Sequence, residues 1–378
     1  MDRIKAYSKT VNWKELGVIA FYGYFAINVL MKAFAYDHGT EIYKLFFLCA
    51  MPLLAIKILT TKYTLREVIW MALLIGLGLM LSVITKQNTW LLLFMTIIGM
   101  KNCDFRVLVH LAVYIRVLSL AILVIGSSCG ALDIGYKTTP DTSYVEIPVY
   151  SFAMREPNTA YLAVFLTLMV LLYDNYEKLN YKWFLGTSVV ALIFYEFTFC
   201  RTGITVFFFA WILIIFEKLV KDKKKKVILA MSVPVGAVFS LVTMWFYNGS
   251  NSLMHLINHF VSGRIYIMNS YFKDQGLSLI PRTQELFYAS YHGLIDNTYM
   301  FVLLYCGVIV ALFFFVMVSW TLIRLYRLGH YKELVFIAAM ALYGVLEQFV
   351  MNGFMNPFIL LCGILLFPGI LKADKNGD

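Results

Sequence analysis

The chain has 378 residues, of which 61% are hydrophobic and 14% are charged. Ordinary globular domains have about 25% charged residues, so this composition excludes a soluble protein. The formal net charge of +10 would suit nucleic acid or an anionic membrane surface, and the positions of the basic residues along the chain distinguish between these partners.

A membrane-spanning helix needs about 20 mostly apolar residues. Twelve apolar runs reach or approach this length, which predicts an all-α polytopic membrane protein with about 12 transmembrane helices in a single integral membrane domain, 1–378. The fourth and sixth runs are short for a full crossing. In chain order the predicted spans are 16–34, 42–59, 68–84, 90–100, 107–126, 161–173, 183–199, 203–220, 227–247, 298–323, 334–350 and 357–371.

The basic residues predict how these spans are oriented, because short loops rich in Lys and Arg stay in the cytoplasm. Both the segment before the first span and the four lysines at 223–226 must then lie inside, and alternation from there leaves both termini cytoplasmic. The positive charge is therefore a topology signal, so we expect membrane lipid and no nucleic acid as a partner. The first span lacks a cleavage motif and is expected to be a signal anchor.

Two predicted outward segments are long enough to carry function, 131–160 and 248–296. Within the second, apolar residues recur at helical spacing over 252–275, which predicts an amphipathic helix lying on the outer leaflet. His255 and His259 have the spacing of a metal pair but no third ligand nearby. The six cysteines are scattered and no nucleotide-binding motif is present, so we expect neither metal nor cofactor.

Outward arginines are the first candidates for a binding site. Arg201 lies in a very short link between two apolar runs, where Gly203 would allow a tight turn. A guanidinium at that depth can bind phosphate through two parallel hydrogen bonds, or it can simply anchor a helix end. Arg264, on the amphipathic helix, either binds the same pyrophosphate or faces solvent. Arg155 and Arg282 are candidates by location alone.

Candidate catalytic groups precede the tenth span. Asp296 can cap that helix or act as a general base, and His292 is the competing base. Glu347 and Gln348 lie near the outer end of the eleventh span, where polar residues mark a substrate pathway. Arg116 lies within the fifth span, and the sequence does not identify its partner.

Short motifs in the outward segments suggest a family. They are Arg201-Thr202-Gly203, Ser262-Gly263-Arg264, Asp296-Asn297-x-Tyr299 before a helix containing Gly307, Glu156-Pro157-Asn158-Thr159, and Glu347-Gln348 with Asn352 and Asn356. In these motifs and in its polytopic architecture, the chain resembles the Wzy-type polysaccharide polymerases, which form a wider group with the O-antigen ligases.

This resemblance implies a GT-C-like membrane glycosyltransferase in the cytoplasmic membrane of a bacterium. Its reaction would join undecaprenyl-pyrophosphate-linked oligosaccharide repeat units at the outer face without a metal ion, with a flippase and a chain-length regulator as possible partners. Arg201 and Arg264 would bind the pyrophosphate, and Asn297 and Tyr299 would line the substrate pathway. Gly293, not Asn, follows His292, which departs from the ligase pattern, favours a polymerase and leaves the base open between His292 and Asp296.

The alternative is a twelve-span secondary transporter or polysaccharide flippase. Transporters place their polar site near the membrane midplane on broken helices, whereas the polar residues here are predicted at the outer surface. A shared pyrophosphate site requires Arg201 and Arg264 to face one region within reach of a lipid headgroup.

Overall fold

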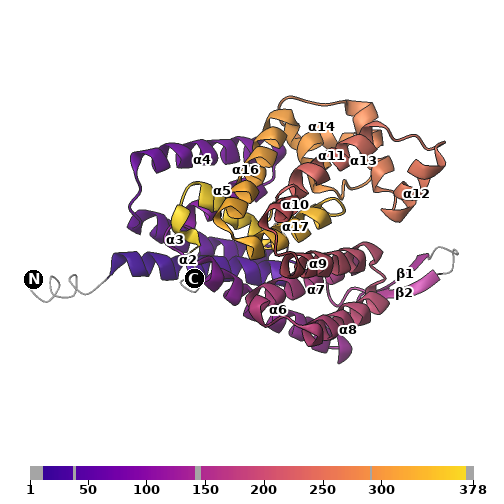
Figure 1. Ribbon diagram of the computed structural model, residues 1–378, viewed down its shortest axis with the longest axis horizontal. Coiled ribbons are helices and arrows are strands. Elements are labelled where there is room, and N and C mark those ends of the chain that lie inside the picture. Colours follow the sequence, from indigo (N-terminus) through magenta and orange to yellow (C-terminus); the bar gives the residue numbers. More distant parts are fainter. Residues whose placement is uncertain (1–11, 37–39, 141–145, 290–291, 372–378) are drawn as a thin grey trace, which may run out of the picture.

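The computed structural model describes residues 12–36, 40–140, 146–289 and 292–371 (Figure 1). The described chain is mostly helical, as predicted, with one small antiparallel hairpin. In the first half the elements are α2 (Trp13–Ala33), α3 (Glu41–Thr60), α4 (Leu65–Thr85), α5 (Thr89–Gly99), α6 (Phe105–Ser128), β1 (Tyr136–Pro140), β2 (Glu146–Tyr150), α7 (Pro157–Asp174), η1 (Tyr176–Lys178) and α8 (Tyr181–Thr198).

The second half contains shorter helices and more breaks. Its elements are α9 (Arg201–Leu219), η2 (Lys223–Lys226), α10 (Val227–Ala230), α11 (Ser232–Trp245), α12 (Ser252–Phe260), α13 (Arg264–Gln275), α14 (Gln284–Ala289), α15 (Thr298–Phe301), η3 (Val302–Cys306), α16 (Gly307–Leu328), α17 (Tyr331–Gly344), η4 (Pro357–Leu365) and η5 (Pro368–Ile370).

Seven helices in the described part of the chain are long and apolar enough to cross a membrane, or eight if the bent pair η2–α10 and α11, which meet at 44°, forms one span. This supports a membrane protein but not the predicted count of twelve. The seven are α2, α3, α4, α6, α7, α9 and the run from α15 to α16, of which the 22 residues of α16 are long enough to cross by themselves. The predicted fourth, eleventh and twelfth spans correspond to α5, α17 and η4, which are too short to cross a membrane. The predicted seventh span corresponds to α8, which is long enough but not apolar enough.

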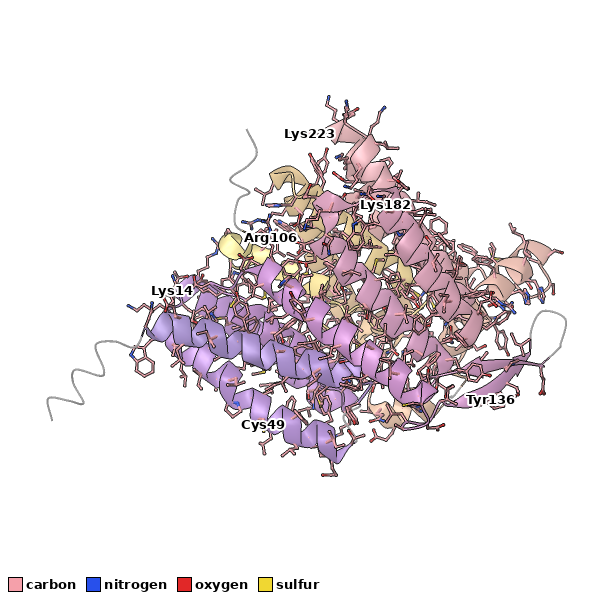
Figure 2. The ribbon with its side chains drawn as sticks, turned by 90° about the horizontal axis from the view of Figure 1, so that it is seen from below. Lys14, Cys49, Arg106, Tyr136, Lys182 and Lys223 are labelled. Carbon is pink, nitrogen blue, oxygen red and sulfur yellow. The ribbon has the colours of Figure 1, made fainter. Side chains whose placement is uncertain are left out.

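The charged ends of several helices gather at one end of the molecule, which we call the basic end. Lys101 forms an ion pair with Glu67 at 2.5 Å, and Lys226 forms one with Glu217 at 2.7 Å. Figure 2 shows Lys14, Arg106, Lys182 and Lys223 along this side, opposite the β1–β2 hairpin. The links that alternation predicted to be cytoplasmic therefore lie together, and we call the opposite end the hairpin end.

Helix α4 shows how the sequence sets a helix start at the basic end. The Thr64 hydroxyl accepts a hydrogen bond from the Glu67 backbone N–H, and the Glu67 carboxylate accepts one from the Thr64 N–H. This reciprocal pair satisfies two backbone donors that a helix start leaves free. Because Glu67 also binds Lys101, the cap joins α4 to the segment that follows α5.

The run from α15 to α16 reverses direction at Gly307. The rings of Tyr299 and Phe315 lie 5.7 Å apart, although sixteen residues of straight helix would separate them by about 24 Å. Gly307 has a φ of +84°, and a Cβ there would lie 2.6 Å from the Ile280 carbonyl oxygen. The α15–η3 segment is thus a limb that folds back beside α16, and only glycine fits the turn.

Helix α17 and η4 form a second incomplete crossing. The fourteen residues of α17 rise about 21 Å, which is short of the roughly 30 Å hydrocarbon core. After an irregular stretch, the Phe358 ring stacks on Phe336 near the start of α17, with 5.3 Å between ring centroids. The chain has therefore turned back inside the bundle, and the predicted eleventh and twelfth spans are the limbs of one buried hairpin.

The two incomplete crossings meet in the interior. The Asn297 side chain donates to the Val345 carbonyl at 2.8 Å and to the Ser240 hydroxyl at 2.9 Å. The Thr298 hydroxyl donates to the Glu347 carbonyl, and the Tyr299 hydroxyl donates to the Ala341 carbonyl. These bonds satisfy backbone groups that the broken helices leave free, so Asn297 and Tyr299 hold the junction together.

Arg116 on α6 supports the irregular stretch after α17. Its side chain is buried and donates to the carbonyls of Phe354 and Met355 at 2.8 and 2.9 Å, and within the described residues it forms no ion pair with a carboxylate. The partner that the sequence could not supply is therefore the backbone of the turn, which Arg116 holds in place.

We expect Arg116→Met to lower the free energy of unfolding by about 2 kcal/mol. Each carbonyl left without a donor costs about 1–3 kcal/mol, and removing a buried charge recovers part of that cost. Thermal unfolding of the purified protein in detergent measures the effect. Arg66→Met, at an exposed arginine of α4, is the control, and equal unfolding midpoints for the two variants would contradict the role of Arg116.

Candidate functional site

A cavity of about 840 Å³ opens at the hairpin end, between the β1–β2 hairpin, the α8–α9 link, α12 and the junction of the two incomplete crossings. Figure 1 shows α12 and the hairpin at the same end of the molecule. The charged residues that line the cavity come from parts of the sequence that lie far apart. They are Lys137, Glu156, Arg201, Arg264, Asp296 and Glu347.

Arg264 is the centre of a buried charge cluster in this cavity. Its guanidinium lies 3.0 Å from the Glu347 carboxylate and 3.7 Å from that of Asp296, and its side chain is only 7% exposed. The preceding Gly263 has a φ of +81°, which turns the chain between α12 and α13 and lets α13 begin at Arg264. The Arg264 Nε is buried and has no hydrogen-bond partner among the described residues.

The two carboxyl groups of this cluster have pKa values above the ordinary range of Glu and Asp. Burial raises the pKa of Glu347 to about 7, although the Arg264 guanidinium opposes the rise. Burial also raises the pKa of Asp296, again against the influence of Arg264. Glu347 follows the end of α17 and Asp296 precedes α15, so both lie outside the helices counted as spans. Glu347 therefore gains and loses a proton near neutral pH.

Arg201 provides a second cation on the same cavity. Its guanidinium lies 4.8 Å from the centre of the Phe199 ring, and it forms no ion pair within the described residues. Phe199 itself has a φ of +51° and makes the tight turn that the sequence assigned to Gly203. Gly203 is needed for another reason, because a Cβ there would lie 2.2 Å from the Tyr161 ring.

Helix α12 contributes polar side chains that the sequence did not single out as site residues. His255, Asn258 and His259 line the cavity, while the apolar residues Leu253 and Phe260 are more than 60% exposed. The predicted amphipathic helix over 252–275 is in fact two helices, broken at Ser262-Gly263 by left-handed backbone. The helical spacing of the apolar residues over 253–260 is the sequence signal for this arrangement, because it places both histidines on the opposite, polar face of the helix.

The structure brings together four of the predicted site residues, Arg201, Arg264, Asp296 and Glu347, and places the others elsewhere. His292 contacts Asp274 and the Tyr271 ring and does not line the cavity. The Arg282 side chain is buried and donates to the carbonyls of Gln275, Gly276 and Leu304, where it satisfies the end of α13.

The remaining predicted residues also lie outside the lining. Arg155 is exposed, and its carbonyl accepts a hydrogen bond from Lys137 at 3.3 Å. Gln348 is half-buried next to Glu347. Asn297 and Tyr299 are buried at the junction, where both side chains form hydrogen bonds, and neither residue lines the cavity.

The cavity combines arginines that can bind an anion with carboxylates that can accept a proton. Among the described residues Arg201 has no carboxylate partner, and Arg264 has two carboxylates beside it. Within the residues that the structure describes, no group of three or more His, Cys, Asp or Glu side chains has the arrangement of a metal site. Comparison of the chain with protein-family models, curated proteins and solved structures finds no match.

Proposed function

We propose that the chain is a glycan polymerase that joins undecaprenyl-pyrophosphate-linked oligosaccharides at the outer face of a bacterial cytoplasmic membrane. The observation that carries the proposal is the convergence of Arg201, Arg264 and Glu347 on one cavity. The positive-inside rule assigns the basic end to the cytoplasm, and the cavity then opens on the outer side. The resemblance to Wzy-type polymerases agrees with this assignment, and a GT-C-like architecture with further crossings remains part of the proposal.

Arg201 is the proposed ligand of the donor pyrophosphate. No carboxylate in the described part of the chain pairs with it, and its planar guanidinium matches two phosphate oxygens. As the bond between the sugar and the pyrophosphate breaks, negative charge grows on the leaving phosphate oxygen. Arg201, helped by the positive charge of Arg264, stabilises that charge, so the proposed reaction needs no metal ion.

Glu347 is the proposed general base, in place of His292, which lies outside the cavity lining. The acceptor hydroxyl oxygen attacks the anomeric carbon of the donor, its proton passes to the Glu347 carboxylate, and undecaprenyl pyrophosphate leaves with the bonding electrons. A base works best when its pKa is near the operating pH, and the pKa of Glu347 meets this condition. Asp296 is the second carboxylate within the same cluster.

Helix α12 fits the demands of a lipid-linked substrate. Its polar residues face the cavity, and its apolar residues Leu253, Leu256 and Phe260 are exposed on the other side. We assign that apolar side to the outer leaflet. The cavity wall would then border the lipid from which the undecaprenyl chain comes, which explains how a membrane-bound donor reaches an aqueous site.

Reconstitution tests the proposal. The purified protein is placed in liposomes with lipid-linked oligosaccharides extracted from the organism that produces it, and glycan length and released undecaprenyl pyrophosphate are measured. We expect a ladder of longer glycans in the absence of any ion gradient. Absence of elongation, with the lipid-linked oligosaccharides intact, would contradict a polymerase, and transfer to a different lipid acceptor would indicate a ligase.

A transporter or flippase is the second candidate, because the charge cluster lies where two incomplete crossings meet, as in secondary transporters. The same liposomes distinguish it. Movement of lipid-linked oligosaccharide across the bilayer without any change in glycan length would favour the transporter. A flippase and a chain-length regulator would otherwise act as separate partners of the polymerase.

A further inference from the structure

A second hollow lies between α7 and α8, far along the helices from the cavity at the hairpin end. It measures about 350 Å³ and is lined by Leu168 and Leu171 of α7 and by Trp183, Gly186 and Val190 of α8, together with Lys182 and Thr187. Neither the charge cluster nor the proposed reaction uses any of these residues. We call this hollow the α7–α8 groove.

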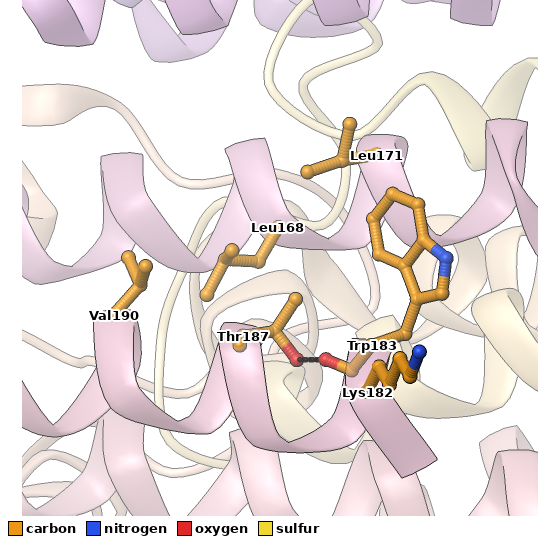
Figure 3. A pocket seen from close by; sticks show the side chains of 7 residues that line it. Leu168, Leu171, Lys182, Trp183, Thr187 and Val190 are labelled. Carbon is orange, nitrogen blue, oxygen red and sulfur yellow. Dashed lines mark hydrogen bonds between the residues drawn. The ribbon is translucent and has the colours of Figure 1, made fainter. Parts of the chain in front are cut away.

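The groove has one polar end and one apolar end. Figure 3 shows the nitrogen atoms of Lys182 and Trp183 at the same end and the side chains of Leu168 and Val190 at the other. Between them, the Thr187 hydroxyl already donates to the Trp183 carbonyl and accepts from the Trp211 indole. The Thr187 hydroxyl therefore has no donor left for a ligand. A charged group would bind at the polar end, beside Lys182 and Trp183.

Exposed apolar side chains flank the groove. On α8 the side chains of Leu185, Val189 and Ile193 are each at least half exposed, as expected of a surface in contact with lipid. Gly186 is exposed, and a Cβ added there would meet nothing within 4 Å. The missing side chain leaves the space that an acyl chain would fill between the two helices.

We propose that the α7–α8 groove binds one anionic phospholipid of the cytoplasmic leaflet. The acyl chain would lie along Leu168, Leu171 and Val190, and the phosphate would meet the Lys182 ammonium and the Trp183 indole N–H. Lys182 and Trp183 lie in the first turn of α8 at the basic end, and basic pockets between helices on the cytoplasmic side select anionic headgroups. The inference is independent of the proposed glycan chemistry.

Lipid-dependent stability of the full chain tests the groove. Thermal unfolding is measured in detergent with added phosphatidylglycerol or phosphatidylcholine, and retained lipid is counted by native mass spectrometry. We expect phosphatidylglycerol to raise the unfolding midpoint more and one molecule to be retained. Lys182→Ala should weaken phosphatidylglycerol binding about fivefold, the contribution of one basic residue near an anionic membrane surface.

Matched variants separate this site from general lipid contact. Gly186→Leu fills the groove and should abolish the retained lipid. Gly76→Leu changes another exposed glycine with open space around it, on α4, and should retain the lipid, as should Lys221→Ala at an exposed lysine of the basic end. Equal stabilisation by the two lipids, or equal lipid retention by Gly186→Leu and Gly76→Leu, would overturn the proposal.

Discussion

Replacing Arg201 with lysine is expected to reduce glycan elongation about 100-fold, the usual effect of losing one hydrogen-bond donor to developing negative charge. Lysine keeps the positive charge but presents a single ammonium, which cannot donate two parallel bonds to a phosphate. Arg201 is half-buried over Phe199 and pairs with no carboxylate of the described residues, so its substitution should leave the fold intact. Elongation by the reconstituted protein measures the effect.

Arg155→Lys is the matched control for this experiment. Arg155 lies at the same end of the molecule but is exposed and does not line the cavity, so its substitution should leave elongation unchanged. Arg201→Lys should mainly lower kcat, because the charge develops as the bond to the leaving group breaks. An unchanged glycan length distribution with Arg201→Lys would exclude the proposed phosphate contact.

Replacing Glu347 with glutamine should reduce kcat by at least about 100-fold, the contribution of a positioned general base. Because burial raises the pKa of Glu347 to about 7, the wild-type rate should rise with pH through about 7 as the carboxylate loses its proton. Glutamine cannot titrate, so the residual rate of the variant should not rise with pH in this range. We call this rise of the rate near pH 7 the pH limb. Rates between pH 5.5 and 8.5 measure both effects.

Two further variants identify the base. Gln348→Asn changes the neighbouring half-buried residue outside the cavity and should keep the wild-type profile. Asp296→Asn should keep the limb near pH 7 if Glu347 is the base. Loss of the limb in Asp296→Asn together with its survival in Glu347→Gln would assign proton transfer to Asp296 instead.

Protonation of Glu347 should also affect anion binding, but affinity should change with pH in the opposite direction to the reaction rate. When Glu347 is protonated below about pH 7, Arg264 loses one competing negative charge and should bind a pyrophosphate diester more tightly. Affinity should therefore rise as pH falls in the wild type, and in Glu347→Gln it should be high at every pH. Calorimetry with a soluble short-chain isoprenyl pyrophosphoryl sugar measures this, and a diester avoids the phosphate pKa near 6 of a monoester.

The sequence predicted where helices lie better than how far they run. Each predicted span overlaps a helix, because long apolar runs are the strongest pattern in such a chain. The runs at 334–350 and 357–371 were misread as crossings, because a limb buried in protein on every side is as apolar as one that faces lipid. Only tertiary contacts, such as Phe358 on Phe336, reveal the turn between them.

The site could be predicted in part for a similar reason. Arg201 and Glu347 were identifiable as charged residues close to apolar runs, where polar groups are costly and tend to be functional. Arg282 looked the same in sequence, yet it binds three backbone carbonyls at a helix end. His255 and His259 were missed as site residues because their spacing was considered only as a metal pair.

Helix α12 has no buried residue, so few buried contacts fasten it to the rest of the bundle. Segments with few buried contacts open locally at low free-energy cost. A polymer that grows longer than the cavity can hold needs such a wall, since a closed chamber would stop at the first product. In the proposed polymerase, α12 would therefore set how freely a lengthening chain leaves, and product length would depend on that helix as well as on the chemistry.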